Sequence, residues 1–110
     1  MSCEIRHEGD VAVVALSGDI DLESSPKVRS ALLDCVGLKQ AVLVDMSSVS
    51  YIDSSGVASL VEAFQTARKS DTRFGLVSVS PPAMRVLELA RLDRIFSIFD
   101  SVAQGIKDPE

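Results

Sequence analysis

The chain has 110 residues, of which 46% are hydrophobic and 25% are charged. This size and balance predict a single compact domain over residues 1–110 with an apolar core, and they exclude an intrinsically disordered chain. The net charge of −5 and the isoelectric point near 4.8 argue against binding to nucleic acid or to an anionic membrane surface, because both require a basic face.

Export and membrane insertion are not indicated by the sequence. No apolar run approaches the roughly 18 residues of a membrane span, and the polar start MSCEIRHEGD does not resemble a signal peptide. The two cysteines, Cys3 and Cys35, lack CxxC spacing, which favours reduced thiols over a metal site. The sequence therefore predicts a cytoplasmic protein without membrane contact.

Catalytic and cofactor-binding patterns are weak. The one histidine, His7, accompanies no GxSxG motif that would mark a hydrolase nucleophile. No GxxxxGK[ST] loop is present, so a nucleotide-binding enzyme is a minor alternative. Asp19 and Asp21 could form a paired-carboxylate site, although loop carboxylates are far more often solvated or capping. We therefore expect no enzyme activity, no catalytic residue, no cofactor and no metal.

The first elements predicted along the chain are a hairpin and a helix. Residues 4–10 alternate weakly, as an edge strand does, and residues 11–18, VAVVALSG, form a β-rich run. Gly9-Asp10 fits the turn between these two strands. The polar stretch 19–26 predicts a loop with a serine helix cap, and residues 26–37 carry apolar side chains at helical spacing.

A buried strand and a long helix are predicted next. Residues 41–46, AVLVDM, begin with four apolar residues in a row, which is typical of a parallel strand buried on both faces. Residues 47–53, SSVSYID, are expected to be the loop that leaves this strand. From Ser55 to Lys69 the apolar residues recur with helical period, which predicts an amphipathic helix.

The last third of the chain continues this alternation. Residues 72–80 predict an interior strand, a helix is expected from about Pro82, and residues 94–100 predict a last short strand. Residues 101–110 are expected to form a helical turn and then a frayed tail. The expected fold class is therefore α/β, with a mixed, mostly parallel sheet of four to five strands and about four helices packed against it.

The stretch Asp53-Ser54-Ser55-Gly56 lies between a predicted strand and a predicted helix, where binding sites gather in open α/β sheets. One polar residue is enough to cap the helix, and a purely capping role is one interpretation. The other is that a spare hydroxyl is exposed at the positive end of the helix dipole, which tolerates an anion. Phosphorylation there would add negative charge beside Asp53 and repel a partner docked on the neutral serine.

Three stretches carry a family resemblance that spans nearly the whole chain. LSGDIDLESSPKVRSAL contains a G-x-x-D loop, Gly18 to Asp21, before the first helix. VLVDMSSVSYIDSSGVASLVEA fits the pattern D-L-S-x-V-x-x-[MI]-D-S-[SAT]-G-[LV], and LELARLDRIFSIFDS fits a C-terminal L-x-x-x-x-L-D-x-x-F pattern. These stretches resemble the STAS-domain family, specifically the stand-alone anti-sigma factor antagonists of bacteria. One departure is Ala58, where many relatives have glycine.

This resemblance implies a cycle of partner switching. An unphosphorylated antagonist binds an anti-sigma factor, usually a GHKL-type serine kinase, and phosphorylation of a serine in the DSSG motif ends that binding. A PP2C-type phosphatase reverses the modification. On this chain the resemblance implies that Ser55 is the phosphorylated residue, with Ser54 as the alternative.

The resemblance also implies a partner-binding surface around the serines. Its expected residues are Asp53, Asp21, Asp19, Gly56 and Val57. Two other roles fit the same family. One is a STAS-type cytoplasmic subunit of a lipid-transport ATPase, and the other is a partner-switching regulator of another process, such as secretion or biofilm formation.

Overall fold

The computed structural model describes residues 1–107 and contains one five-stranded sheet in the order β1-β2-β3-β4-β5. Strand β1 is antiparallel to β2, and the other neighbouring strands are parallel. The strands are β1 (Ser2–Glu8), β2 (Val11–Ile20), β3 (Ala41–Ile52), β4 (Phe74–Val77) and β5 (Ser97–Phe99). The helices are α1 (Ser25–Gly37), α2 (Ser54–Lys69), α3 (Pro81–Leu89), the 3₁₀ turn η1 (Leu92–Arg94) and α4 (Val102–Lys107). The frayed tail predicted at the end of the chain falls on residues 108–110, outside the described residues.

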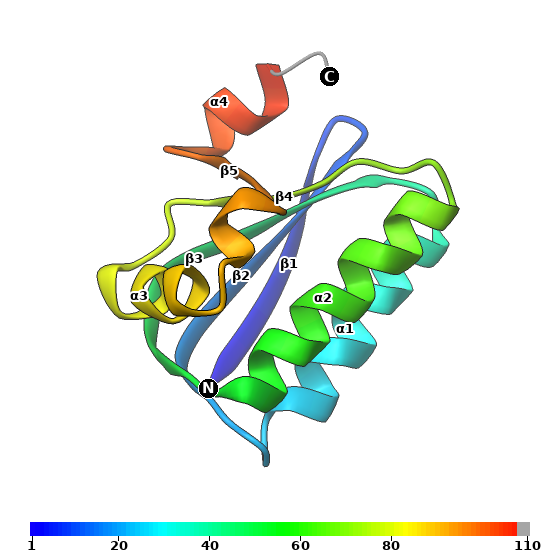
Figure 1. Ribbon diagram of the computed structural model, residues 1–110. Helices are drawn as coiled ribbons and strands as arrows, with labels where there is room; N and C mark the ends of the chain where they lie inside the picture. The colour runs from blue at the N-terminus through cyan, green and yellow to red at the C-terminus, as the bar shows by residue number, and fades with distance from the viewer. Residues whose placement is uncertain (108–110) are drawn as a thin grey trace.

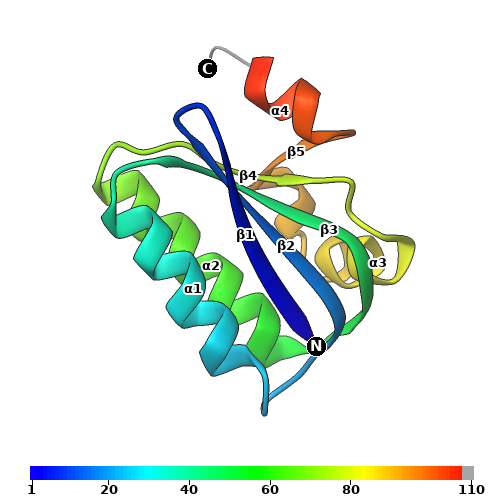
Figure 2. The ribbon, with the colours of Figure 1, turned by 180° about the vertical axis from the view of Figure 1, so that it is seen from behind.

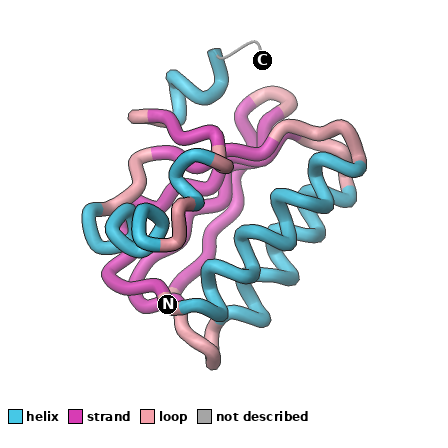
Figure 3. The backbone as a smooth tube through the Cα atoms, in the orientation of Figure 1, coloured by secondary structure: helices cyan, strands magenta, loops and turns pink. Residues whose placement is uncertain are grey.

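Successive side chains of each strand point to opposite faces of the sheet, and this divides the core in two. On β2, Ala12 and Val14 join the larger apolar cluster, which also contains buried residues of α1, α2 and α3. Val11 and Val13 join a smaller cluster, against which residues of α4 pack. Figure 1 shows α1 and α2 side by side along the sheet with α4 apart from them, and Figure 3 shows the strands as one layer between the helices.

The predicted fold class is confirmed: the sheet is mixed and mostly parallel, and four α-helices pack against it. The predicted hairpin is also present, because Glu8 pairs with Val11 across a two-residue turn. Gly9 opens that turn with φ of 64°, a backbone conformation that glycine adopts without steric cost. The segment 41–46 is a parallel strand with buried side chains in both clusters, as its apolar run predicted.

The prediction of a loop at residues 47–53 is wrong. Strand β3 continues to Ile52 and pairs with β2 as far as Ile20, so both strands are longer than expected. The pairing register slips twice in this stretch because β3 carries one extra residue at each slip. Buried side chains therefore fall three residues apart, at Met46, Val49 and Ile52, and the two-residue alternation that marks a strand is lost.

Several element boundaries also differ from the predictions. Strand β4 covers only the middle of the predicted segment 72–80, because Ser78 has φ of 52° and turns the chain. The segment 94–100 contains the end of η1 before β5 begins. Helices α2 and α3 each begin one residue earlier than expected.

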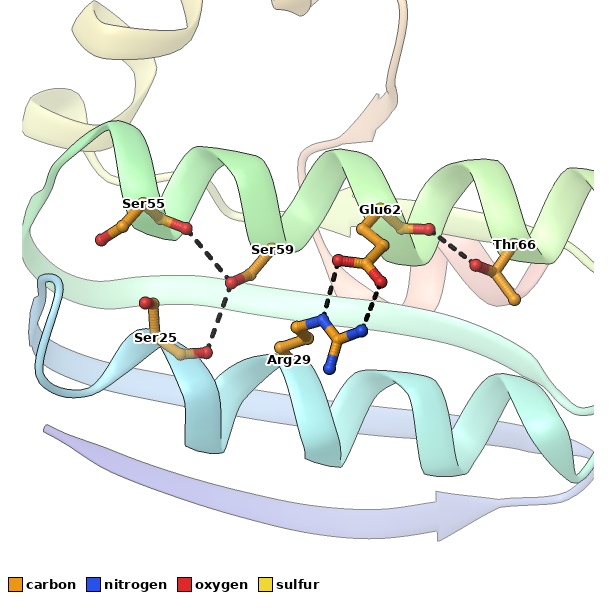
Figure 4. A network of polar contacts seen from close by, with 6 residues as sticks. All are labelled: Ser25, Arg29, Ser55, Ser59, Glu62 and Thr66. Carbon is orange, nitrogen blue, oxygen red and sulfur yellow. Dashed lines mark hydrogen bonds and ion pairs between the residues drawn. The ribbon is translucent and has the colours of Figure 1, made fainter.

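Polar contacts join α1 and α2 along their facing sides (Figure 4). The buried Ser59 hydroxyl donates to the carbonyl oxygens of Ser25 at 3.3 Å and Ser55 at 3.1 Å. Farther along the pair, the Arg29 guanidinium donates two hydrogen bonds of 2.7 Å to the Glu62 carboxylate. Because Ser59 bridges the first turns of both helices, the beginning of α2 is fixed relative to α1.

Gly56 allows α2 to begin very close to the sheet. A β-carbon at this position would lie 2.7 Å from Ile52 Cγ1, 2.8 Å from Ile20 Cγ2 and 3.1 Å from the Ile20 carbonyl oxygen. Such approaches are well inside van der Waals contact, and the backbone oxygen has little freedom to move away. The absence of a side chain, rather than an unusual backbone conformation, is what this position requires.

We expect the substitution Gly56→Ala to destabilise the fold. The added methyl group overpacks the contact with Ile20 and Ile52, at a cost of about 1–3 kcal/mol. This cost exceeds the gain of at most about 1 kcal/mol that alanine brings to a helix. Equilibrium unfolding in urea measures the difference. The matched control is Gly37→Ala, where a β-carbon meets no atom within 4 Å, and an equal effect of the two substitutions would contradict the close packing.

Candidate functional site

The side chain of Asp53 caps the N-terminus of α2. Its backbone is extended, with φ of −105° and ψ of −173°, so the chain turns into the helix at the next residue. Asp53 Oδ1 accepts hydrogen bonds from the backbone N–H groups of Ser55 at 2.9 Å and Gly56 at 3.2 Å. These bonds satisfy donors that have no partner within the helix. Among the polar residues of the motif, the one that caps the helix is therefore Asp53.

The hydroxyl of Ser55 is oriented by the same carboxylate. Ser55 Oγ donates a hydrogen bond of 2.5 Å to Asp53 Oδ1. This bond is the main cause of a lowered pKa for Asp53, and the backbone N–H groups of Gly56, Ser55 and Leu22 lower the pKa further, against an opposing effect of desolvation. The carboxylate is therefore charged at neutral pH and acts as an acceptor for the Ser55 proton.

The residues that begin α2 differ in their access to solvent. Ser54 is exposed, and Ser55 and Val57 are partly exposed. Gly56 is buried against the sheet, and a direct partner contact at this position stays a prediction. The two hydroxyls thus lie at the accessible end of α2. Gly56, which follows them, sets how closely the helix packs against the sheet.

Asp21 organises the loop between β2 and α1. Its Oδ1 atom accepts hydrogen bonds from the backbone N–H groups of Glu23 and Ser24, both at 3.1 Å. Ser24 occupies the N-cap position of α1, but its hydroxyl makes no capping bond to the helix and instead bonds within the loop, accepting from the Asp21 backbone N–H at 2.9 Å. The sequence predicts a serine cap in this loop, but in the structure an aspartate holds the loop in its conformation.

This loop lies directly beside the serine motif. The backbone N–H of Asp53 donates to the Ile20 carbonyl oxygen at 3.1 Å, and the Leu22 N–H contributes to the lowered pKa of the Asp53 carboxyl. Asp19 pairs with Tyr51 in the ladder between β2 and β3. The structure therefore brings together the acidic loop and the serines, which are separated by about thirty residues in the sequence.

The surface around the motif combines negative charge with exposed apolar side chains. A shallow depression is lined by Met1, Asp19, Asp21, Glu23, Ser24 and Lys27. Leu22, in the same loop, is 76% exposed, and Tyr51, which pairs with Asp19, is 51% exposed. Sequence reasoning missed Leu22, although one apolar residue within the polar run DIDLESSP was a usable signal.

Other kinds of site receive no support from the described residues. Across residues 1–107, no group of three or more His, Cys, Asp and Glu side chains is arranged to hold a metal ion. No helix in the same range is long and apolar enough to cross a membrane. His7 pairs with Ala12 near the hairpin, whereas the serines follow Ile52, which pairs with Ile20 at the other end of β2. His7 is therefore not part of a triad with these serines.

Several bacterial proteins resemble this chain in sequence and fold. A family model described as the STAS domain matches residues 2–105. The anti-sigma-B factor antagonist of Listeria monocytogenes is 31% identical over 101 residues, which cover 89% of this chain and 88% of that protein.

Solved structures give the same result. An anti-sigma factor antagonist from Mycobacterium paratuberculosis has a TM-score of 0.87 at 26% identity, covering 96% of this chain and 90% of that one. The Bacillus protein SpoIIAA in its phosphorylated form has a TM-score of 0.75 at 17% identity over 96% of both chains, which shows a likeness of fold alone. From the family match over residues 2–105 and the relative that is 31% identical, we conclude that the chain belongs to the STAS domain family.

Proposed function

We propose that this protein is an anti-sigma factor antagonist that binds an anti-sigma factor through the surface around Ser55 and is released when Ser55 is phosphorylated. The observation that carries the proposal is the Ser55 hydroxyl, which is partly exposed at the start of α2 and bonded to a charged carboxylate at 2.5 Å. The names of the relatives from Listeria and Mycobacterium support the same role. The protein acts in the cytoplasm, without catalysis of its own.

The bound partner, a GHKL-type serine kinase, phosphorylates Ser55. Ser55 Oγ attacks the γ-phosphorus of ATP, the bond from that phosphorus to the bridging oxygen breaks, and ADP leaves. Asp53 accepts the hydrogen bond of the hydroxyl and so holds the oxygen in position, and the hydroxyl proton passes to a base of the bound kinase. Ser54 is more exposed and lacks this carboxylate contact, which is why Ser55 is the favoured acceptor. A PP2C-type phosphatase hydrolyses the phosphoester and restores the hydroxyl.

Release follows from the charge at the start of α2. A phosphate carries about −1.5 to −2 charges at neutral pH. It would lie beside the Asp53 carboxylate, which already occupies the N–H groups of Ser55 and Gly56. Asp19 and Asp21 add to the negative potential of the same surface. A partner that fits the neutral hydroxyl would meet both added volume and repulsion, whereas the helix itself tolerates an anion at this end.

The partner-binding surface consists of the motif and the loop that contacts it. Leu22 and Tyr51 provide exposed apolar area, and Val57 is partly exposed on the first turn of α2. Asp19 and Asp21 provide negative charge that suits a basic patch on the partner. Asp53 connects the two parts of this surface, because it contacts both the start of α2 and the loop between β2 and α1.

We expect Ser55→Ala to bind the cognate anti-sigma factor at least as tightly as the unmodified protein, in the presence or absence of ATP. Ser55→Asp places a second carboxylate beside Asp53 and should weaken binding by roughly tenfold or more, about 1.4 kcal/mol. Isothermal titration calorimetry measures both affinities. Ser54→Ala and Ser54→Asp are the matched controls and should change the affinity less than the Ser55 variants do.

Peptide mass mapping after incubation with the kinase and ATP tests the modification itself. Phosphate is expected on Ser55, and its absence from both Ser54 and Ser55 would contradict the proposed switch. Equal affinities of Ser55→Ala and Ser55→Asp would contradict the electrostatic explanation. Co-purification with a transport ATPase in place of a kinase would favour the structural-subunit alternative.

The Asp53 carboxyl should make the stability of the fold depend on acid pH. Its pKa is lower in the folded chain than the ordinary value of 3.8, so the folded state binds fewer protons in that range. Its stabilising contribution is therefore complete above the unfolded-state pKa and is lost as the pH falls through the folded-state pKa. We expect Asp53→Asn, which keeps a capping oxygen but does not titrate, to give a shallower loss of stability below pH about 4.

Urea midpoints measured from neutral pH downwards give this dependence. Asp34→Asn, which removes one exposed carboxylate from α1, is the matched control. If Asp53→Asn and the unmodified protein lost stability in parallel between neutral pH and pH about 3, the assigned role of the carboxylate in the cap would be wrong.

A further inference from the structure

Strand β1 leaves one edge of the sheet open. Within residues 1–107 it is the first strand in the sheet order and pairs with β2 alone. Six of its seven residues are exposed, and Figure 2 shows the strand along the outer margin of the sheet. An edge strand of this length presents unpaired backbone donors and acceptors to which another strand can add.

The hairpin determines which backbone groups of β1 are available. Glu8 and Val11 close a two-residue turn, and the closing pair of such a turn exchanges both backbone hydrogen bonds. Bonded and non-bonded pairs then alternate along an antiparallel ladder, so every second residue directs its N–H and C=O groups away from β2. The residues with outward-directed groups are Cys3, Ile5 and His7.

We propose that β1 pairs antiparallel with β1 of a second copy of this chain, about a two-fold axis that passes through Ile5. In this register Glu4 lies opposite the partner's Arg6, and Arg6 lies opposite the partner's Glu4. Side chains at these two positions share one face of the sheet because they are two residues apart. The dimer therefore contains two pairs of opposite charge, and each copy supplies one residue to each pair. Opposite charges placed across from each other in this way stabilise an antiparallel ladder.

Charge selects this register over its neighbours. An axis through Glu4 would set Glu4 opposite the partner's Glu4, and an axis through Arg6 would set two arginines opposite each other. Like charges placed directly opposite destabilise an antiparallel pair. Registers farther along the strand pair fewer of its seven residues. The axis through Ile5 is the one that pairs the full strand and sets opposite charges against each other.

The other face of the strand adds apolar contact to this pairing. Ile5 is 45% exposed in the single chain and would meet the partner's Ile5 across the axis. Within one chain, Arg6 donates to Glu8 at 2.8 Å in an exposed ion pair. Exposed pairs of this kind contribute little, so the guanidinium is free to turn toward the partner's Glu4.

The proposed dimer leaves the serine surface of each copy accessible. The N-terminal end of β1 lies near the acidic loop, because Met1 lines the same depression as Asp19 and Asp21. Antiparallel pairing places the two N-terminal ends of β1 at opposite ends of the combined sheet. This inference does not depend on the proposed function, and Ser55→Asp should dimerise as well as the unmodified protein does.

Sedimentation velocity over a range of protein concentrations tests the dimer. The unmodified protein should shift from monomer to dimer as the concentration rises toward roughly millimolar. Glu4→Arg places arginine opposite arginine, and Arg6→Glu places glutamate opposite glutamate, so each variant alone should self-associate at least tenfold more weakly. An equimolar mixture of these two variants should recover the dimer, because each chain then supplies the charge that the other lacks.

Two further chains make the test decisive. The double variant Glu4→Arg with Arg6→Glu exchanges the charges within one chain and should dimerise like the unmodified protein. Glu88→Arg changes the net charge as Glu4→Arg does, but on the exposed side of α3, and should leave dimerisation unchanged. Circular dichroism confirms that each variant is folded. A monomeric unmodified protein at all concentrations, or a mixture that stays monomeric while the unmodified protein dimerises, would overturn the inference.

Discussion

The carboxylate of Asp53 is the contact on which the site depends. Its Oδ1 atom accepts from the backbone N–H groups of Ser55 and Gly56 and from the Ser55 hydroxyl, while the N–H of Leu22 contributes from the neighbouring loop. One ionised group thus begins the helix, orients the hydroxyl and joins the helix to the loop between β2 and α1. A change of charge at Ser55 would act directly on the helix cap and on the orientation of the hydroxyl, because both use the same Asp53 oxygen.

The position of that carboxylate is fixed by packing beneath it. Ile20 and Ile52 end two paired parallel strands and leave no room for a side chain at Gly56. Ser59 then holds the first turn of α2 against α1 through two carbonyl oxygens. The apolar contact sets the depth of the helix, and the polar contact sets its position along the neighbouring helix. The site is therefore a small polar arrangement on a rigid base.

Much of this architecture is predictable from the sequence, because periodicity and capping chemistry are local. The apolar run AVLVDM, the helical repeat after Ser55 and the turn at Gly9 each match what the structure contains. The stretch 47–52 could not be predicted as strand, because its two bulges remove the alternation on which such a prediction depends. The proximity of Leu22 to Asp53 is a tertiary contact, and no local sequence pattern indicates it. The role of Asp21 in organising its loop was also not predicted, because Ser24 and Ser25 in the same loop are equally plausible capping residues.

The joined helices have a consequence for how such a switch operates over time. The buried Ser59 bridges the first turns of α1 and α2, so a phosphate at the start of α2 would act on a helix whose position is already set by packing beneath it. Adding or removing the group would alter the surface and leave the interior as it was. Under the proposed function, the charge at Ser55 alone would then set whether the chain binds, and the rate of switching would be set by the enzymes that add and remove the phosphate.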